Sequence, residues 1–239
     1  MRLSRTARLF FLLGWVFFVL YPDPGLLQRS IHNFRRADVD AAAVVGLARR
    51  LPDKPRLIER AVLDTVVPYS YDWQTSGVPW YFPTTAEVLK AGRGDCESRA
   101  LVLASILKAK GIPYRLRLSF DHIWVDYPGK QPNAWENDRV AMGERRNGRF
   151  VLFWPQDFHP WQELQAQLAI YWTPMPPLRK LLLLAGLLLV PLWNALAAAA
   201  GRLLRCPPPL SLWPGSAWRL RRRRLARRAR GLALGRQRV

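Results

Sequence analysis

The chain has 239 residues, enough for one or two domains, and it carries 37 basic against 17 acidic residues, a formal charge of +20. Half of its residues are hydrophobic and 12% are aromatic, which excludes a disordered chain, and its two cysteines exclude a disulfide-dense secreted scaffold. All acidic residues lie between Asp23 and Glu163, whereas residues 201–239 contain many Arg and no acid. A nearly balanced middle segment therefore lies between two basic ends.

An apolar run, Leu9–Tyr21, follows the basic residues Arg2, Arg5 and Arg8. A basic stretch followed by an apolar one is typical of a signal peptide, but no small-residue cleavage site comes after this run. We therefore expect residues 1–21 to form an uncleaved N-terminal membrane anchor, with a cleaved signal-like helix as the alternative.

Helical periodicity dominates the first half of the middle segment. Residues 38–67 predict one or two helices, with an interruption at Pro52 and Pro55. After a loop rich in aromatic residues, Thr84 and Glu87 stand three positions apart, as in a capping box. This pair predicts the start of another short helix.

Asp95 predicts the N-cap of a longer helix over residues 96–110, whose apolar residues recur with the helical period. Alternating residues then predict two strands, over 114–120 and 123–127, and a further strand over 149–154. Helices followed by antiparallel strands indicate an α+β fold.

The second apolar run, Leu181–Ala200, contains no charged residue and has the length of a helix that crosses a bilayer. Arg179 and Lys180 precede it. We expect a transmembrane helix over residues 178–201, with a buried core helix as the alternative, followed by an Arg-rich tail over 202–239.

The basic flanks also predict an orientation, because they tend to stay in the cytoplasm. Both ends are therefore expected in the cytoplasm, and residues 22–177 are expected to form an extracytoplasmic domain. The composition, rich in Arg, Ala and Leu, indicates a bacterial source, and hence the inner membrane with the domain on its periplasmic side. For the tail we expect contact with anionic lipid, docking of a protein being one alternative. Nucleic-acid binding is the other, and we do not expect it beside a membrane helix.

Cys96 is the one cysteine of this expected domain, and it stands at the first turn of a predicted helix. The helix dipole lowers the pKa of a thiol there, whereas Asp95 and Glu97 oppose this effect, so a further partner is needed. His122 could supply it, and a third group would then orient the imidazole. The candidates for that group are Asp138 and, as alternatives, Glu136 and Asn133.

The run from Gly92 to Tyr127, GRGDCESRALVLASILKAKGIPYRLRLSFDHIWVDY, resembles the transglutaminase-like domain of the papain-like cysteine enzymes. The shared pattern is Gly-x-Cys at a helix start, Gly-Ile-Pro after that helix, and His-x-Trp-Val followed by an acid in a strand. The resemblance covers residues 55–155. It implies a transglutaminase-like core, with helices preceding an antiparallel sheet, flanked here by the two expected transmembrane helices.

Carried onto this sequence, the resemblance implies Cys96 as nucleophile, His122 as base and Asp138 as the third residue. The usual Trp-x-x-x-Asp spacing is one residue shorter here, from Trp135 to Asp138. The oxyanion donors would be the Cys96 backbone amide and one side chain of the aromatic loop. The candidates for that side chain are Trp73, Gln74 and Trp80.

These features predict a membrane-anchored, cysteine-dependent amide hydrolase or transamidase with a thioester intermediate, acting on peptide or protein substrates outside the cytoplasm. The alternative is a non-catalytic transglutaminase-like module that binds a peptide or scaffolds a membrane complex. We expect no cofactor and no metal, because the three histidines are far apart in sequence and no Gly-rich phosphate loop follows a strand. Besides the substrate, the expected partner is the lipid bilayer.

Overall fold

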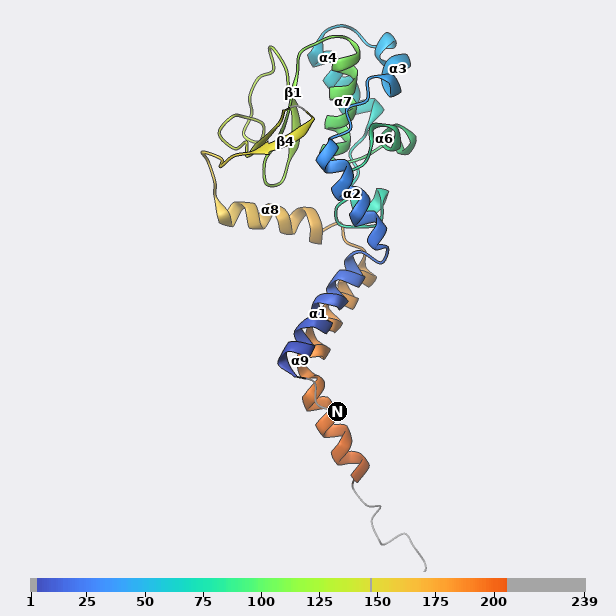
Figure 1. Cartoon of the computed structure of the whole chain (residues 1–239), viewed down its shortest axis with the longest axis vertical. Helices are drawn as coiled ribbons and strands as arrows, with labels where there is room; N and C mark the ends of the chain where they lie inside the picture. Colours follow the sequence, from blue (N-terminus) through green and yellow to red (C-terminus); the bar gives the residue numbers. More distant parts are fainter. Residues whose placement is uncertain (1–3, 147, 206–239) are drawn as a thin grey trace, which may run out of the picture. The chain divides into compact units, whose positions relative to one another are not determined.

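The computed structural model describes residues 4–146 and 148–205 (Figure 1). The chain divides into two units, residues 9–187 and residues 1–8 with 188–239, and each is described by itself. The helices, in chain order, are α1 (Arg5–Leu20), α2 (Pro24–Arg36), a 3-10 helix (Ala42–Val44), α3 (Val45–Arg50), α4 (Pro55–Ala61), a π-helical turn (Val62–Val66), α5 (Asp72–Thr75), α6 (Thr85–Ala91), α7 (Cys96–Ala109), α8 (Pro160–Trp172) and α9 (Pro177–Arg205). The strands are β1 (Arg115–Leu118), β2 (Ile123–Asp126), β3 (Gly143–Arg146) and β4 (Arg149–Leu152).

Helix α7 forms the centre of the larger unit. Asp95 caps it by accepting a hydrogen bond from the backbone N–H of Ser98, as the sequence predicts. Strands β1 and β2 pack against one side of α7, and α3, α4 and α6 pack against it elsewhere (Figure 1). Nearly all residues from Glu97 to Leu107 are buried, so burial extends well beyond a single apolar stripe.

The strands form one antiparallel sheet in the order β2-β1-β3-β4. In the β1–β2 pair, Leu116 lies opposite Val125 and both are buried, but the next pair, Arg117 and Trp124, is buried as well, so the predicted alternation does not hold on these strands. Strand β3, with the sequence Gly-Glu-Arg-Arg, has no apolar alternation and is not predicted. It pairs through its backbone with β1 on one side and β4 on the other. The α+β class is confirmed.

Local sequence signals account for several helix ends. The capping box is present in full, since Thr84 Oγ1 accepts from the Glu87 N–H and Glu87 Oε2 accepts from the Thr84 N–H, at 3.2 and 2.8 Å. Helix α3 ends at Arg50 and α4 begins at Pro55, which confirms the predicted interruption. Proline suits the first position of a helix because the N–H it lacks would have no partner there.

Within residues 9–187, α1 and the beginning of α9 lie side by side. Trp15 Nε1 donates to the Leu182 carbonyl at 2.9 Å, and a Cβ added to Gly186 would lie only 2.2 Å from the Trp15 ring. Arg179 donates to the last two carbonyls of α1, at 3.2 and 3.1 Å. Glycine therefore allows the close approach, and an arginine caps the end of the neighbouring helix.

Trp73 of α5 joins this helix pair to the rest of the unit. It is buried in a small apolar cluster with Val19, Met175 and Leu183. Its indole N–H donates to the Tyr171 carbonyl at 2.8 Å. One side chain thus contacts α1, α9 and the end of α8.

Among the described residues, no single helix meets the length and hydropathy expected of a membrane span. Two bent pairs of neighbouring helices meet these criteria together. They are Arg5–Leu20 with Pro24–Arg36, bent by 75°, and Pro160–Trp172 with Pro177–Val190, bent by 118°. The expected Arg-rich tail lies outside the described residues from position 206 onward.

Candidate active site

Cys96 is the first residue of α7, and its thiol is partly buried. The Sγ donates to Oε2 of Glu97 at 3.0 Å. Burial, followed by the charges of Glu97 and Asp95, raises the pKa of the thiol well above its ordinary value, while the backbone of Ile123 acts in the opposite direction. The sequence predicts that a helix N-terminus lowers this pKa, but burial and two acidic neighbours outweigh the dipole. The resting thiol is therefore protonated at neutral pH.

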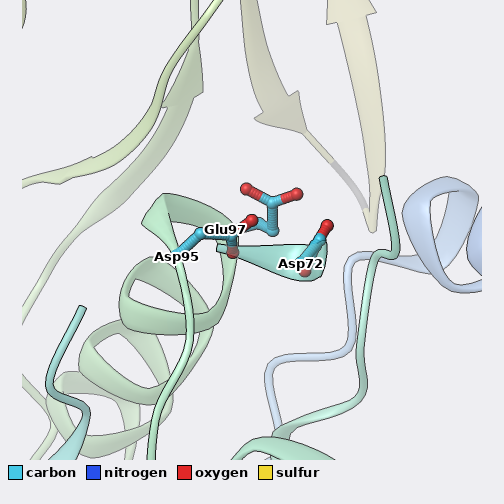
Figure 2. Close-up of side chains that lie close together, drawn as sticks. All are labelled: Asp72, Asp95 and Glu97. Atoms are coloured by element: carbon cyan, nitrogen blue, oxygen red, sulfur yellow. The ribbon is translucent and has the colours of Figure 1, made fainter. Parts of the chain in front are cut away.

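Three carboxyl groups lie together beside this thiol: Asp72 of α5, Asp95 and Glu97 (Figure 2). All three residues are buried, and one oxygen of each lies within 4.8 Å of the others. Burial, followed by the charge of Asp95, raises the pKa of Asp72 to about 9. Burial likewise raises the pKa values of Asp95 and Glu97. At this spacing the three groups share protons, because they cannot all ionise in a buried site.

Sequence reasoning misses this acid cluster, because Asp72 precedes Asp95 by a long aromatic loop and belongs to another helix. By geometry, the three oxygens are a set that could hold a metal ion. A search for metal ligands confined to His and Cys does not find them. Asp72 also accepts a hydrogen bond from the Tyr81 backbone at 2.6 Å, which holds its carboxyl group in place.

His122 lies directly before β2 and faces a different carboxylate. Its Nε2 is 2.9 Å from Oε1 of Glu136, and its ring stacks on Trp124 with centroids 5.9 Å apart and planes 9° apart. No described residue forms a hydrogen bond with the other ring nitrogen, Nδ1. The orientation of the imidazole is thus set on one side by a carboxylate and on one face by an indole.

The structure places Glu136, and not Asp138, against His122. The Asp138 side chain is 75% exposed and pairs with Arg117 of β1. The Glu136 side chain is 18% exposed. Of the candidates for the third group, Glu136 and not Asp138 therefore contacts His122, because the loop turns one acid inward and the other outward.

Asn133 causes this turn. Its Oδ1 accepts hydrogen bonds from the backbone N–H groups of Trp135 and Glu136, at 2.8 and 2.9 Å. Such an Asx turn reverses the chain within a few residues. Asn133 Nδ2 also donates to Glu136 Oε2 at 3.3 Å, so the third residue weighed from the sequence supports the Glu136 carboxylate.

Lys130 completes the contacts of Glu136. Its Nζ lies 2.8 Å from Glu136 Oε2 and 2.7 Å from Glu59 Oε1, and its side chain is only 9% exposed. Burial alone would raise the pKa of Glu136, but the hydrogen bonds from His122 and Lys130 and the charge of Lys130 lower it to about 2. Glu136 is therefore ionised throughout the neutral range.

A comparison of the sequence with models of protein families identifies the family of the domain that contains this site. The family model described as the transglutaminase-like superfamily matches residues 37–177, more than half of the chain. The chain belongs to the transglutaminase-like superfamily. Comparisons with curated proteins and with solved structures found no match. The matched range confirms the family that the Gly92–Tyr127 motifs resemble, and it includes Cys96, His122 and Glu136.

The transglutaminase-like domain has two cavities that are both lined by Cys96 and His122. The larger has a volume of about 500 Å³ and is lined also by Glu136, Lys130 and one side of α8. The smaller has a volume of about 300 Å³. Its lining includes the acid cluster, Trp73, Trp80 and Tyr171. The thiol and the imidazole are therefore reachable from the same open space, as a shared reaction would require.

The three side chains considered as oxyanion donors are placed differently. The Trp73 indole N–H already donates to Tyr171, and Gln74 accepts from Ser70 and lines neither of these two cavities. Trp80 lines the smaller cavity, and no described residue binds its indole N–H. Trp80 is thus the candidate donor beside the Cys96 backbone amide.

Proposed function

We propose that the chain is a membrane-anchored, cysteine-dependent amide hydrolase or transamidase acting on peptide or protein substrates outside the cytoplasm. Cys96 is its nucleophile and His122 its general base. Glu136 takes the place of Asp138 as the residue that orients His122. This assignment goes beyond family membership, which supports a possible cysteine-dependent enzyme.

The contact between His122 and Glu136 carries the proposal. Glu136 is ionised, so its carboxylate can only accept a hydrogen bond from Nε2 of His122. The neutral imidazole therefore keeps its proton on Nε2. Nδ1 is then the basic nitrogen, and it has no hydrogen-bond partner among the described residues. A base oriented in this way, on the wall of a cavity that contains a thiol, supports acid–base chemistry at Cys96.

The chemistry proceeds by acyl transfer. His122 Nδ1 takes the proton of the Cys96 thiol as the sulfur forms a bond to the substrate carbonyl carbon. The tetrahedral intermediate collapses when His122 returns this proton to the leaving amine and the C–N bond breaks, which leaves a thioester. Water or a second amine then attacks the thioester, His122 accepts its proton, and the thiol is regenerated as the acid or the new amide is released.

The raised pKa of the thiol fits general-base activation. A thiol that is protonated at rest loses its proton only while the C–S bond forms, so the base has to be within reach at that moment. Trp80 and the Cys96 backbone amide are the donors that we assign to the oxyanion. Their N–H groups would stabilise charge that develops on the carbonyl oxygen.

Single-turnover acylation by p-nitrophenyl acetate tests this function, because the reagent needs no knowledge of the natural substrate. We expect an acetyl thioester on Cys96, detected by mass spectrometry, to form faster than on Cys206, the other cysteine of the chain. His122→Ala should slow the reaction at Cys96 by about 10²-fold or more, the usual contribution of a general base. Cys96→Ser is the control for acetylation at other residues.

The second candidate function is a non-catalytic transglutaminase-like module that binds a peptide. It is favoured by the acid cluster beside the thiol, because neighbouring carboxyl groups oppose the formation of a thiolate. In such a module, p-nitrophenyl acetate would acylate Cys96 no faster than Cys206, and His122→Ala would leave the acylation rate of Cys96 unchanged. That outcome would replace the enzyme by the binding module.

Membrane anchoring is the second part of the proposal. The two apolar sequence runs support it, as do the exposed apolar side chains along α1 and, separately, along α9. The proposed spans are residues 1–21 and 178–201 of a bacterial inner-membrane protein, with residues 22–177 in the periplasm. The tail over 202–239 would lie on anionic lipid in the cytoplasm.

Fusions to a reporter that is active only outside the cytoplasm test this orientation. A fusion after residue 177 should be active and a fusion after residue 239 inactive, because the positive-inside rule keeps both basic ends in the cytoplasm. The reverse pattern would contradict the proposed topology. Equal activity at both positions would contradict a span between them.

A further inference from the structure

Helix α8 carries a row of large apolar side chains that the described part of the protein does not cover. The row consists of Trp161, Leu164, Leu168 and Trp172, with exposed fractions of 68, 49, 56 and 40%. Their spacing of three and four residues places them on one face of the helix. This outer face contains no charged residue, and a tryptophan stands at each end.

The opposite face of α8 belongs to the candidate active site. Ala166, Ala169 and Ile170 line the larger cavity together with Cys96 and His122. At about 100° per residue, Ala166 and Ile170 lie opposite the outer face and Ala169 lies at its flank. Polar contacts hold α8 in this orientation, since Gln167 donates to the Phe120 carbonyl at 2.9 Å and Trp73 donates to that of Tyr171.

The connection to α9 indicates what covers the outer face. Residues 173–176 lead directly from α8 into α9, and the two helices are bent by 118°, closer to perpendicular than to parallel. Figure 1 shows α8 lying across the direction of the first turns of α9. If α9 crosses a bilayer, a helix attached to its beginning at such an angle lies along the membrane surface.

A positive charge next to the end of α8 is suited to contact with lipid head groups. Lys180 Nζ lies 5.6 Å from the centroid of the exposed Trp172 ring and donates to the Thr173 carbonyl at 3.2 Å. Tryptophan with neighbouring cations is the composition that proteins show at the membrane–water interface. Anionic head groups attract such cations, while the apolar face of the helix is buried at the edge of the acyl chains.

We propose that α8 is an interfacial membrane helix whose outer face binds the bilayer and whose inner face forms a wall of the Cys96 cavity. The inference rests on the membrane anchoring proposed above and deepens it, because it places the reaction at the membrane surface. The substrate class that such a cavity suits is an amide-bearing chain itself held at the bilayer surface.

Nitroxide labels on the full chain test this placement in lipid nanodiscs of phosphatidylethanolamine and phosphatidylglycerol. On a background with Cys96→Ser and Cys206→Ser, single cysteines replace Leu168 on the outer face of α8, Leu57 on α4, or Leu184 on α9. Leu57 is the matched control, since it is a 46% exposed leucine on another part of the domain. Molecular oxygen concentrates in the bilayer, whereas a nickel chelate stays in water, so the relaxation that each causes reports the position of the label.

We expect oxygen to relax the labels at 168 and 184 more than the chelate does, and the ratio to reverse at 57. If the label at 184 lies in the bilayer and the label at 168 in water, the inference about α8 is overturned and the membrane anchor stands. If the label at 184 lies in water, the anchor fails and the inference falls with it. Protection of 168 from both reagents would overturn lipid binding in favour of a protein partner on this face.

Discussion

Carboxylates line both cavities that contain Cys96, and their protons behave in opposite ways. The acid cluster of Asp72, Asp95 and Glu97 consists of acids alone, and the pKa of Asp72 is raised to about 9. Glu136 is also largely buried, yet contacts with His122 and Lys130 lower its pKa to about 2. Burial is common to both sites, so the charge of the neighbours decides the direction of the shift.

The largest expected effect comes from removing the charge that orients the imidazole. Glu136→Gln should slow acylation of Cys96 by about 10²-fold or more, because the neutral amide no longer selects the tautomer with a basic Nδ1. Asp138→Asn is the matched control, since Asp138 pairs with Arg117 and is exposed. Single-turnover acylation by p-nitrophenyl acetate measures both variants. A larger loss in Asp138→Asn than in Glu136→Gln would restore the assignment made from the sequence.

The next effect concerns the cation between two carboxylates. Lys130→Met should destabilise the domain by about 3 kcal/mol or more, because it leaves Glu59 and Glu136 buried without their cation. Arg60→Met removes an exposed pair with Asp64 and should change stability by less than about 1 kcal/mol. Denaturant unfolding followed by near-ultraviolet circular dichroism measures both. Equal losses would mean that Lys130 is not the cation that stabilises this network.

The two sites should also respond to pH in opposite directions. The folded-state pKa of Glu136 is lowered from 4.5 to about 2, so its stabilising contribution is present above pH 4.5 and is lost as the pH falls toward 2. The pKa of Asp72 is raised from 3.8 to about 9, so its contribution is present below pH 3.8 and is lost as the pH rises toward 9.

Asp72→Asn isolates the second of these responses. The amide can still accept from the Tyr81 N–H but does not titrate, so the loss of stability between pH 4 and pH 9 should become smaller than in the wild type. Thermal unfolding midpoints at several pH values measure this slope. A slope identical to that of the wild type would show that Asp72 is ionised in the folded protein.

The smallest effect should appear at the thiol itself. Glu97→Gln removes an acidic neighbour of Cys96, so that no negative charge can form at this position as the pH rises, and iodoacetamide should then react several-fold faster with Cys96 than in the wild type. The reaction of Cys206 in the same sample is the reference. A slower reaction at Cys96 would indicate that the hydrogen bond from Sγ to Glu97 activates the thiol.

The elements that the sequence predicts are those with a local signal. Asp95 and the pair of Thr84 and Glu87 lie at helix starts as expected, because a cap depends only on residues within one turn. Strand β3 has no such signal, since its Glu-Arg-Arg sequence pairs through the backbone between two other strands. Helix α8, which is not among the predicted elements, also has a local signal, since it begins at Pro160 and carries apolar residues at helical spacing.

The site is predictable where it follows family motifs and not where it depends on long-range geometry. Cys96 and His122, the residues that the family motifs single out, line the same cavities. The choice between Glu136 and Asp138 depends on an Asx turn at Asn133, whose direction residue spacing does not reveal. Asp72 reaches Asp95 and Glu97 only through the tertiary fold, so no sequence pattern joins these three acids.

The position of Trp73 has a mechanical consequence. Its ring packs between residues of α1 and α9, and the residue before it in α5 is Asp72. A change in the tilt of the helix pair, of the kind that a thicker or thinner bilayer imposes, would displace this ring and the carboxyl group attached to the same short helix. If the helix pair is anchored in a membrane as proposed, the distances within the acid cluster, and hence the sharing of its protons beside Cys96, would depend on the surrounding lipid.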